Sequence, residues 1–123
     1  MRVADASFLV AALNESDALH EMAMEKLGEA EPIVIPHEVL VETLGVLRAK
    51  IGRNNDAAIL ASLRGLPHLE LRATVDLAPA AALLARFPRL GLVDCIAIRH
   101  AIVEGAQLVT FDKTQRKTWE TLR

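Results

Sequence analysis

The sequence predicts an α/β fold, in which a mainly parallel sheet of about four strands is flanked by helices. Short apolar runs alternate along the chain with longer segments that carry helix caps and helix stops, an order typical of parallel sheets. The chain has 123 residues, of which 52% are hydrophobic, and this is enough for one buried core. The composition excludes an intrinsically disordered chain. We therefore expect a single domain over residues 1–123.

Four short segments have the composition of buried strands. The clearest is the β-branched run that ends at Pro36, because β-branched side chains favour extended backbone and proline suits the end of such a run. The other three are shorter and consist mainly of apolar residues. The expected strands are residues 3–4, 32–35, 69–71 and 107–110.

The helices are delimited by residues that start or stop helical structure. Ser16 is expected to cap the second helix, Pro36 suits the first turn of the third, and Asp76 caps the fifth. Asn54 or Asn55 caps the fourth, and glycines or prolines follow most of the helices as stops. The expected helices cover residues 8–13, 16–27, 36–51, 55–65, 77–87 and 92–104, and the polar tail from residue 113 is expected to be partly helical.

Composition and charge narrow the classes of function. The net charge is −2 and the pI is near 6.1, which disfavours a strongly basic, non-specific nucleic-acid binder but allows a local basic patch. Cys95 is the only cysteine in the sequence, so neither an internal disulfide nor a cysteine zinc cluster is possible. No apolar run approaches the roughly eighteen residues that span a bilayer. We expect a soluble, cytoplasmic protein with no membrane partner.

Acidic residues at strand ends are the first indication of a functional site. Asp5 follows the first expected strand, and Asp112 comes just after the last. Parallel α/β sheets bind their ligands at the carboxyl ends of the strands. Asp94 lies on a face of small apolar residues in the sixth expected helix, and Glu42 lies beside the apolar stripe of the third. Each acid also has a structural explanation, as a helix cap or a solvated residue, and both explanations stay open here.

Four carboxylates gathered at one site would repel one another, and this repulsion indicates the chemistry. Crowding pushes one or more of them toward the neutral form unless a cation is present. Mg²⁺ takes oxygen ligands, retains several waters and needs only one or two direct carboxylates, and Mn²⁺ suits the same donors. An acidic cluster without His or Cys ligands therefore favours phosphate chemistry over zinc hydrolysis.

Four sequence blocks, in a fixed order along the chain, carry a family resemblance. The first has an Asp at a strand end and a Ser two residues on, and the second is a helix with a Glu. The third leads an Ala- and Ile-rich helix with an Asp, and the fourth is a closing strand with an acid. They are residues 3–10 (VADASFLV), 35–44 (IPHEVLVETL), 90–98 (LGLVDCIAI) and 108–113 (LVTFDK). Together they resemble the PIN-domain nucleases, and most closely the VapC-type toxins of toxin–antitoxin pairs.

The resemblance implies a PIN-like (Rossmann-like) three-layer sandwich and a Mg²⁺- or Mn²⁺-dependent endoribonuclease. The catalytic acids that it implies are Asp5, Glu42, Asp94 and Asp112. Asp5 and Asp94 are implied as direct metal ligands, while Asp112 and Glu42 act through water or complete a second metal position. Two hydroxyl groups are implied to hold the carboxylates or the waters of the metal, those of Ser7 and Thr110.

The resemblance also implies an RNA substrate, a cognate antitoxin that masks the acids, and a homodimer. Basic residues close after the last acid are candidate RNA contacts, namely Lys113, Arg116 and Lys117. A second basic group ends the third expected helix and consists of Arg48, Lys50 and Arg53. Aromatic residues make up only 3%, so base stacking has few candidates beyond Phe8, Phe111 and Trp119.

Two departures from the family pattern keep alternatives open. The family often has a further acid shortly after the fourth block, but residues 113–115 contain none, which puts a second metal position in question. The chain also ends soon after Trp119, so a last short strand is expected to be reduced or missing. One alternative is a catalytically inactive PIN-fold module that binds RNA or protein. Another is a phosphohydrolase with Asp5 as nucleophile, disfavoured because such enzymes usually have a second Asp where this chain has Ser7.

Overall fold

The strands form one parallel sheet in the computed structural model, which describes residues 1–52 and 55–123. The order across the sheet is β3-β2-β1-β4, and every neighbouring pair is parallel. This confirms the expected parallel α/β fold and its number of strands. The strands are β1 (Arg2–Ala4), β2 (Ile33–Pro36), β3 (Leu69–Arg72) and β4 (Gln107–Val109).

The order of the strands reverses beside β1. The chain adds β2 and then β3 on one side of β1, and afterwards crosses to the other side, where β4 pairs with β1. A reversal of this kind opens a crevice at the carboxyl ends of the strands, because the connections on either side of it leave in opposite directions. Asp5 and Asp112 therefore emerge at the edge of the sheet where ligands bind in this class of fold.

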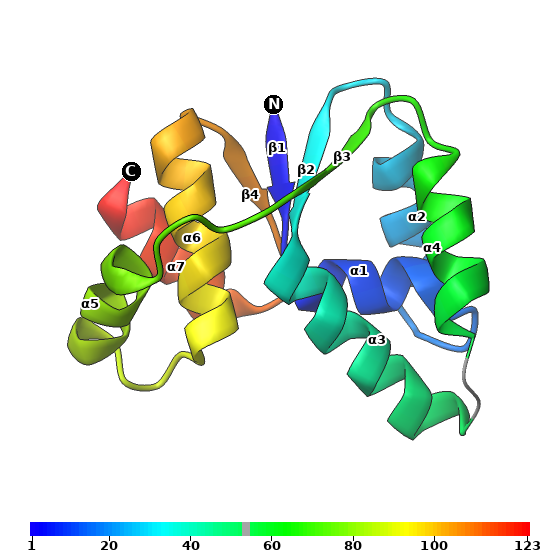
Figure 1. Ribbon diagram of the computed structural model, residues 1–123, viewed down its shortest axis with the longest axis horizontal. Coiled ribbons are helices and arrows are strands. Elements are labelled where there is room, and N and C mark those ends of the chain that lie inside the picture. Colours follow the sequence, from blue (N-terminus) through cyan, green and yellow to red (C-terminus); the bar gives the residue numbers. More distant parts are fainter. Residues whose placement is uncertain (53–54) are drawn as a thin grey trace.

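Seven helices in the described part of the chain flank the sheet. Figure 1 shows α5, α6 and α7 on one side of it and α1, α2, α3 and α4 on the other, which gives the three layers expected from the sequence. Their bounds are α1 (Ala6–Leu13), α2 (His20–Gly28), α3 (His37–Ile51), α4 (Asp56–Arg64), α5 (Ala78–Arg86), α6 (Leu92–Glu104) and α7 (Lys113–Leu122).

The core fixes the helices that carry the acids. Phe8 of α1, Ile35 of β2 and the α6 residues Ile96 and Ile98 are all buried in one apolar cluster. Burial of a side chain of this size stabilises the fold by about 1.5–3 kcal/mol. The first turns of α1 and α6 are therefore held firmly against the sheet, next to the carboxyl end of β1.

The second helix begins later than the sequence predicted. Ser16 does not cap it, because the Ser16 N–H donates to Asn14 Oδ1 at 3.1 Å, and the Leu19 N–H donates to Asp17 Oδ1 at 2.8 Å. Asn and Asp side chains that bond the backbone two residues on form turns that compete with a helix. As a result α2 starts only at His20, four residues after the predicted cap.

The ends of the chain are more helical than expected. α1 begins at Ala6, two residues before the predicted start, because the Asp5 carboxylate caps it by accepting the Phe8 N–H at 3.0 Å. The tail is a regular helix of ten residues, and its buried face includes Gln115 and Trp119. After β4 the described chain contains no fifth strand, as expected from the short tail.

Two glycines end helices in the left-handed conformation, as the sequence predicted. Gly52 has φ 74° after α3, and Gly105 has φ 60° after α6, a region that side chains with a Cβ rarely adopt. Asn55 precedes α4 but its side chain makes no capping bond, and Asn54 lies outside the described residues. Within the described residues, no helix has the length and apolar character needed to cross a membrane.

Candidate acidic site

Asp5 lies at the carboxyl end of β1, with only 2% of its surface exposed. Its Oδ1 accepts hydrogen bonds from Ser7 Oγ at 2.9 Å and from the Phe8 N–H at 3.0 Å. Its Oδ2 accepts a bond of 2.6 Å from Thr110 Oγ1, across the gap between β1 and the end of β4. A buried carboxylate needs such donors, because loss of water disfavours its charge. The donors fix the orientation of Asp5, but all of them are uncharged.

The hydroxyl groups of Ser7 and Thr110 connect Asp5 to the segment that follows β4. Ser7 Oγ accepts the Phe111 N–H at 3.0 Å, and Thr110 Oγ1 accepts the Asp112 N–H at 2.9 Å. The two hydroxyl oxygens are 3.2 Å apart. The Asp112 carboxylate in turn caps α7. The structure therefore brings both predicted hydroxyl groups to Asp5, and it ties the backbone of Asp112 to the same network.

Asp94 lies half-buried in the first turn of α6. Its Oδ2 accepts the Gly91 N–H at 3.0 Å, so the carboxylate satisfies one backbone donor at the start of α6. The fully buried Gln115 of α7 donates its Nε2 to the Asp94 carbonyl at 3.3 Å. Gln115 thus joins the helix that Asp112 begins to the helix that Asp94 begins. Gln115 was not predicted from the sequence, although its place on the same face of α7 as Trp119 was an available signal.

Glu42 completes the cluster from α3, which packs against both α1 and α6. Its side chain is exposed, yet its pKa is raised, first by partial loss of water and then by the charges of Asp94 and Asp5. Only carboxylates that lie near one another interact in this way. The structure therefore brings Glu42 to the same end of the sheet as Asp5 and Asp94.

Asp5 and Asp94 also have raised pKa values. Burial raises the pKa of Asp5, hydrogen bonds from Thr110, Phe8 and Ser7 partly offset it, and the charge of Asp94 adds to it. Burial also raises the pKa of Asp94, the bond from the Gly91 backbone offsets part of this, and the charge of Asp112 adds to it. All four predicted acids are therefore electrostatically coupled.

The coupled acids fit a hydrated divalent cation. Among the described residues, no basic group forms a salt bridge with any of the four. Their oxygen atoms are donors of the kind that Mg²⁺ and Mn²⁺ prefer. Across residues 1–52 and 55–123, no three acidic, histidine or cysteine side chains converge closely enough to hold an ion by themselves. Mg²⁺ suits such an open set, because it keeps several waters and needs only one or two direct carboxylates.

The basic residues near Asp112 have different surroundings. The Arg116 guanidinium donates to the Thr110 carbonyl and so braces the segment after β4. Lys113 and Lys117 are exposed on α7. The two lysines therefore remain accessible as the RNA contacts that the sequence predicted, whereas Arg116 has a structural bond as well.

The members of the second basic group differ in how accessible they are to RNA, and so do the aromatic residues. Arg48 pairs with Asp56 at 2.7 Å, Lys50 is exposed near the end of α3, and Arg53 lies outside the described residues. Phe8 and Trp119 are buried and unavailable for stacking on a base, which leaves the half-buried Phe111.

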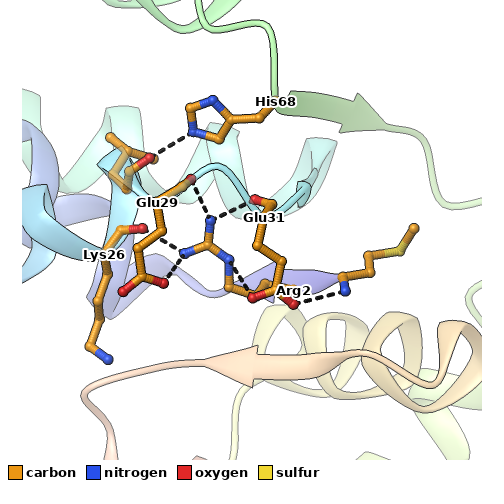
Figure 2. A network of polar contacts seen from close by, with 7 residues as sticks. Arg2, Lys26, Glu29, Glu31 and His68 are labelled. Atoms are coloured by element: carbon orange, nitrogen blue, oxygen red, sulfur yellow. Dashed lines mark hydrogen bonds and ion pairs between the residues drawn. The ribbon is translucent and has the colours of Figure 1, made fainter.

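A second polar cluster lies at the opposite, amino end of the sheet (Figure 2). The Arg2 guanidinium donates to the carbonyl oxygens of Lys26, Glu29 and Glu31 at 2.6, 3.2 and 2.6 Å. It also lies 3.6 Å from the carboxylates of Glu29 and Glu31. The ammonium group of Met1 binds Glu31 at 2.9 Å. The sequence analysis did not single out Arg2, whose single charge inside a short apolar strand was the signal.

The strand reversal and the acids beside it define a class, a parallel α/β domain with a cluster of acidic side chains at the carboxyl edge of its sheet. The model of the PIN domain family matches residues 2–119, and the chain belongs to this family. A similar solved structure is that of VapC20 from Mycobacterium tuberculosis, described as a toxin that cleaves the sarcin–ricin loop. It has a TM-score of 0.81 and 24% identity, over 95% of this chain and 94% of that one, which confirms the PIN-like fold. No curated protein matches the chain.

Proposed function

We propose that this protein is a Mg²⁺- or Mn²⁺-dependent endoribonuclease, and the toxin of a toxin–antitoxin pair that acts in the cytoplasm. One observation carries the proposal: acids from four separate segments, Asp5, Glu42, Asp94 and Asp112, are coupled at one end of the sheet without a basic partner among the described residues. Membership of the PIN domain family supports it. The similar toxin VapC20 is described as cleaving an RNA loop, which supports an RNA substrate.

Each acidic side chain would have a different role in such a site. Asp5 is held rigidly by Ser7 and Thr110, so it offers its charge in one fixed direction. Asp94 has one carboxylate oxygen bonded to its own helix, and in the described structure its Oδ1 accepts no hydrogen bond and is free to bind. Glu42 and Asp112 add charge at the rim. When bound, the divalent ion would activate water and neutralise charge on the phosphoryl group.

The proposed partners follow from the family resemblance. We propose that an antitoxin segment covers the acids in the inhibited state, and that the active protein is a homodimer. An antitoxin would have to meet the negative charge of the uncovered carboxylates, which favours a basic group at its point of contact. Lys113 and Lys117 are proposed to contact RNA phosphates beside the site.

Cleavage of a defined RNA in the presence and absence of divalent ions tests the function. The wild-type protein is expected to cut RNA with Mg²⁺ or Mn²⁺ and to stop in EDTA. Asp5→Asn and Asp94→Asn should each lower the rate by at least about a hundredfold. Asp76→Asn is the matched control, because Asp76 also bonds the backbone near the start of a helix but has no part in the cluster. Circular dichroism checks that all variants are folded.

The same experiment separates the enzyme from an inactive RNA-binding module. No three of the acids converge on one point in the described residues, and this open arrangement is the observation that favours an inactive module. Binding of RNA without cleavage, together with no heat of Mn²⁺ binding by calorimetry, would establish the inactive module. Cleavage that persists in EDTA, or in both variants, would reject the metal-dependent site.

A further inference from the structure

A groove runs from the acidic site along α1 and α3, and its lining is unlike that of the site itself. It has a volume of about 310 Å³, within the range of small-molecule sites, and most of its surface is apolar. One end is marked by Ser7 and Glu42 of the acidic site, and the exposed Lys50 stands in its lining as well. The groove therefore has the negative Glu42 and the positive Lys50 in its lining, with mostly apolar surface besides.

One face of α3 sets the spacing within this groove. Glu42, Val46 and Lys50 follow one another at intervals of four residues, and all three line the groove. At a rise of about 1.5 Å per residue, the backbone positions of Glu42 and Lys50 are about 12 Å apart along the helix axis. Among the described residues Lys50 forms no salt bridge, so its ammonium group is available to an anion.

Small side chains, Leu19 and one aromatic ring form the rest of the apolar lining. Ala6, Val10 and Ala11 of α1 contribute a shallow surface, and Phe111 contributes its ring. The ring packs against that of the buried Phe8 in a tilted arrangement, with the two ring centres 6.0 Å apart. A flat aromatic surface beside small apolar groups is the type of environment on which an unstacked base binds.

We propose that this groove binds the nucleoside next to the scissile phosphate, with its base against Phe111 and the α1 alanines and the following phosphate on Lys50. The inference rests on the proposed nuclease function and adds a subsite to it. Charge complementarity selects the occupant: each nucleoside of a single RNA strand has a phosphate on either side of its sugar and a base with a flat π-face. The acidic end, where a divalent ion would bind one phosphate, the apolar lining and Lys50 match this arrangement. Asp17 at the rim is engaged with the Leu19 N–H.

Binding of a single-stranded oligoribonucleotide tests the phosphate contact. The Asp94→Asn protein is titrated with a fluorescent RNA of mixed sequence in Mg²⁺, so that binding is measured without cleavage. Adding Lys50→Ala should weaken binding about tenfold at low salt and reduce the slope of log Kd against log salt by about 0.7. Lys50→Arg should restore both. Lys26→Ala, at the opposite end of the sheet, is the control and should change neither.

A second measurement tests the base contact. Single abasic nucleotides are placed in turn along the RNA, and one position is expected to lose about tenfold in affinity. That loss should disappear when Val46→Phe fills the groove, because the base is then already excluded. Equal effects of Lys50→Ala and Lys26→Ala, or an abasic scan that is flat, would overturn the subsite.

The outcomes also distinguish this proposal from the function on which it rests. If wild-type protein cleaves RNA but neither Lys50 nor any single base matters, the subsite is wrong and the nuclease stands. If RNA binds through Lys50 but is not cut in Mg²⁺ or Mn²⁺, the nuclease is wrong and the groove is an RNA-binding site. If only a protein partner, and not RNA, is affected by Lys50→Ala, the groove is a protein interface and the subsite is rejected.

Discussion

The two ends of the sheet differ in how their charged groups are balanced. At the amino end, two positive groups, Arg2 and the Met1 ammonium, face two carboxylates, Glu29 and Glu31. At the carboxyl end, four coupled carboxylates have only uncharged donors and no salt bridge among the described residues. A balanced cluster stabilises the fold by itself, whereas an unbalanced one gains stability when a ligand of opposite charge binds.

The pKa values express the same difference. The hydrogen bond from the Met1 ammonium to Glu31 is the largest of the effects that lower the pKa of that carboxyl group, so its charged form is favoured. Burial and neighbouring acids raise the pKa values of Asp5, Glu42 and Asp94, so their charged forms are disfavoured. Perturbation toward the neutral form, in a cleft, is typical of functional sites rather than of structural ion pairs.

The largest effect is expected from removing the buried cation at the amino end. Arg2→Met leaves three carbonyl oxygens without their donor and should lower the free energy of unfolding by about 3 kcal/mol, measured by urea denaturation. Nuclease activity per folded molecule should not change. Arg64→Met, at an exposed position, is the control and should cost little. A small effect of Arg2→Met would mean that the two ends do not differ as described.

At the carboxyl end, Thr110→Val tests whether the hydroxyl group positions Asp5. The variant keeps the shape of the side chain but removes the bond of 2.6 Å, and it should lower the cleavage rate about 10- to 100-fold. Thr118→Val is the matched control, because Thr118 donates only within its own helix. Equal activity of the two variants would show that Asp5 does not need this donor.

Divalent ions should stabilise only the unbalanced end. At ten times its dissociation constant, Mg²⁺ is expected to stabilise the folded protein by about 1.4 kcal/mol, seen as a higher melting temperature. Asp5→Asn should abolish the shift, while Glu31→Gln at the other end should retain it. A shift of equal size in both variants would place the ion elsewhere.

The smallest effect is the dependence of stability on pH. The folded pKa of Asp94 lies above its ordinary value of 3.8, so between these two values the folded state binds more protons than the unfolded state, and stability falls as the pH rises. The loss is complete once the pH is above the folded pKa. Without divalent ions, Asp94→Asn should therefore melt above wild type at pH 7. The gain should vanish below pH 3.8, and a gain independent of pH would contradict the coupling.

Much of the fold was predictable because its signals are local. The β-branched run before Pro36 and the glycines after α3 and α6 act through the backbone of a few residues, and their elements lie close to where the sequence put them. The start of α2 was wrong for a local reason too. Two competing turns, at Asn14 and Asp17, outweigh the cap that Ser16 offered.

The site was predictable in its residues but not in its connections. Asp5, Asp94 and Asp112 each follow a recognisable strand or start a helix, so their types and places are readable. The bond from Gln115 to the Asp94 carbonyl depends on how α7 packs against α6, and no pattern within either helix specifies that contact. Contacts of this kind arise from tertiary packing and need coordinates.

The hydrogen bond between Thr110 and Asp5 joins positions 105 residues apart, the first and the last strand of the sheet. During synthesis, the Asp5 carboxylate cannot bind Thr110 until all the intervening residues have been made. This takes roughly 5 to 20 s at typical rates of translation. Until β4 and the segment after it are made, Asp5 lacks both this donor and the neighbouring Asp112, so the acidic cluster is complete only when the chain is nearly finished.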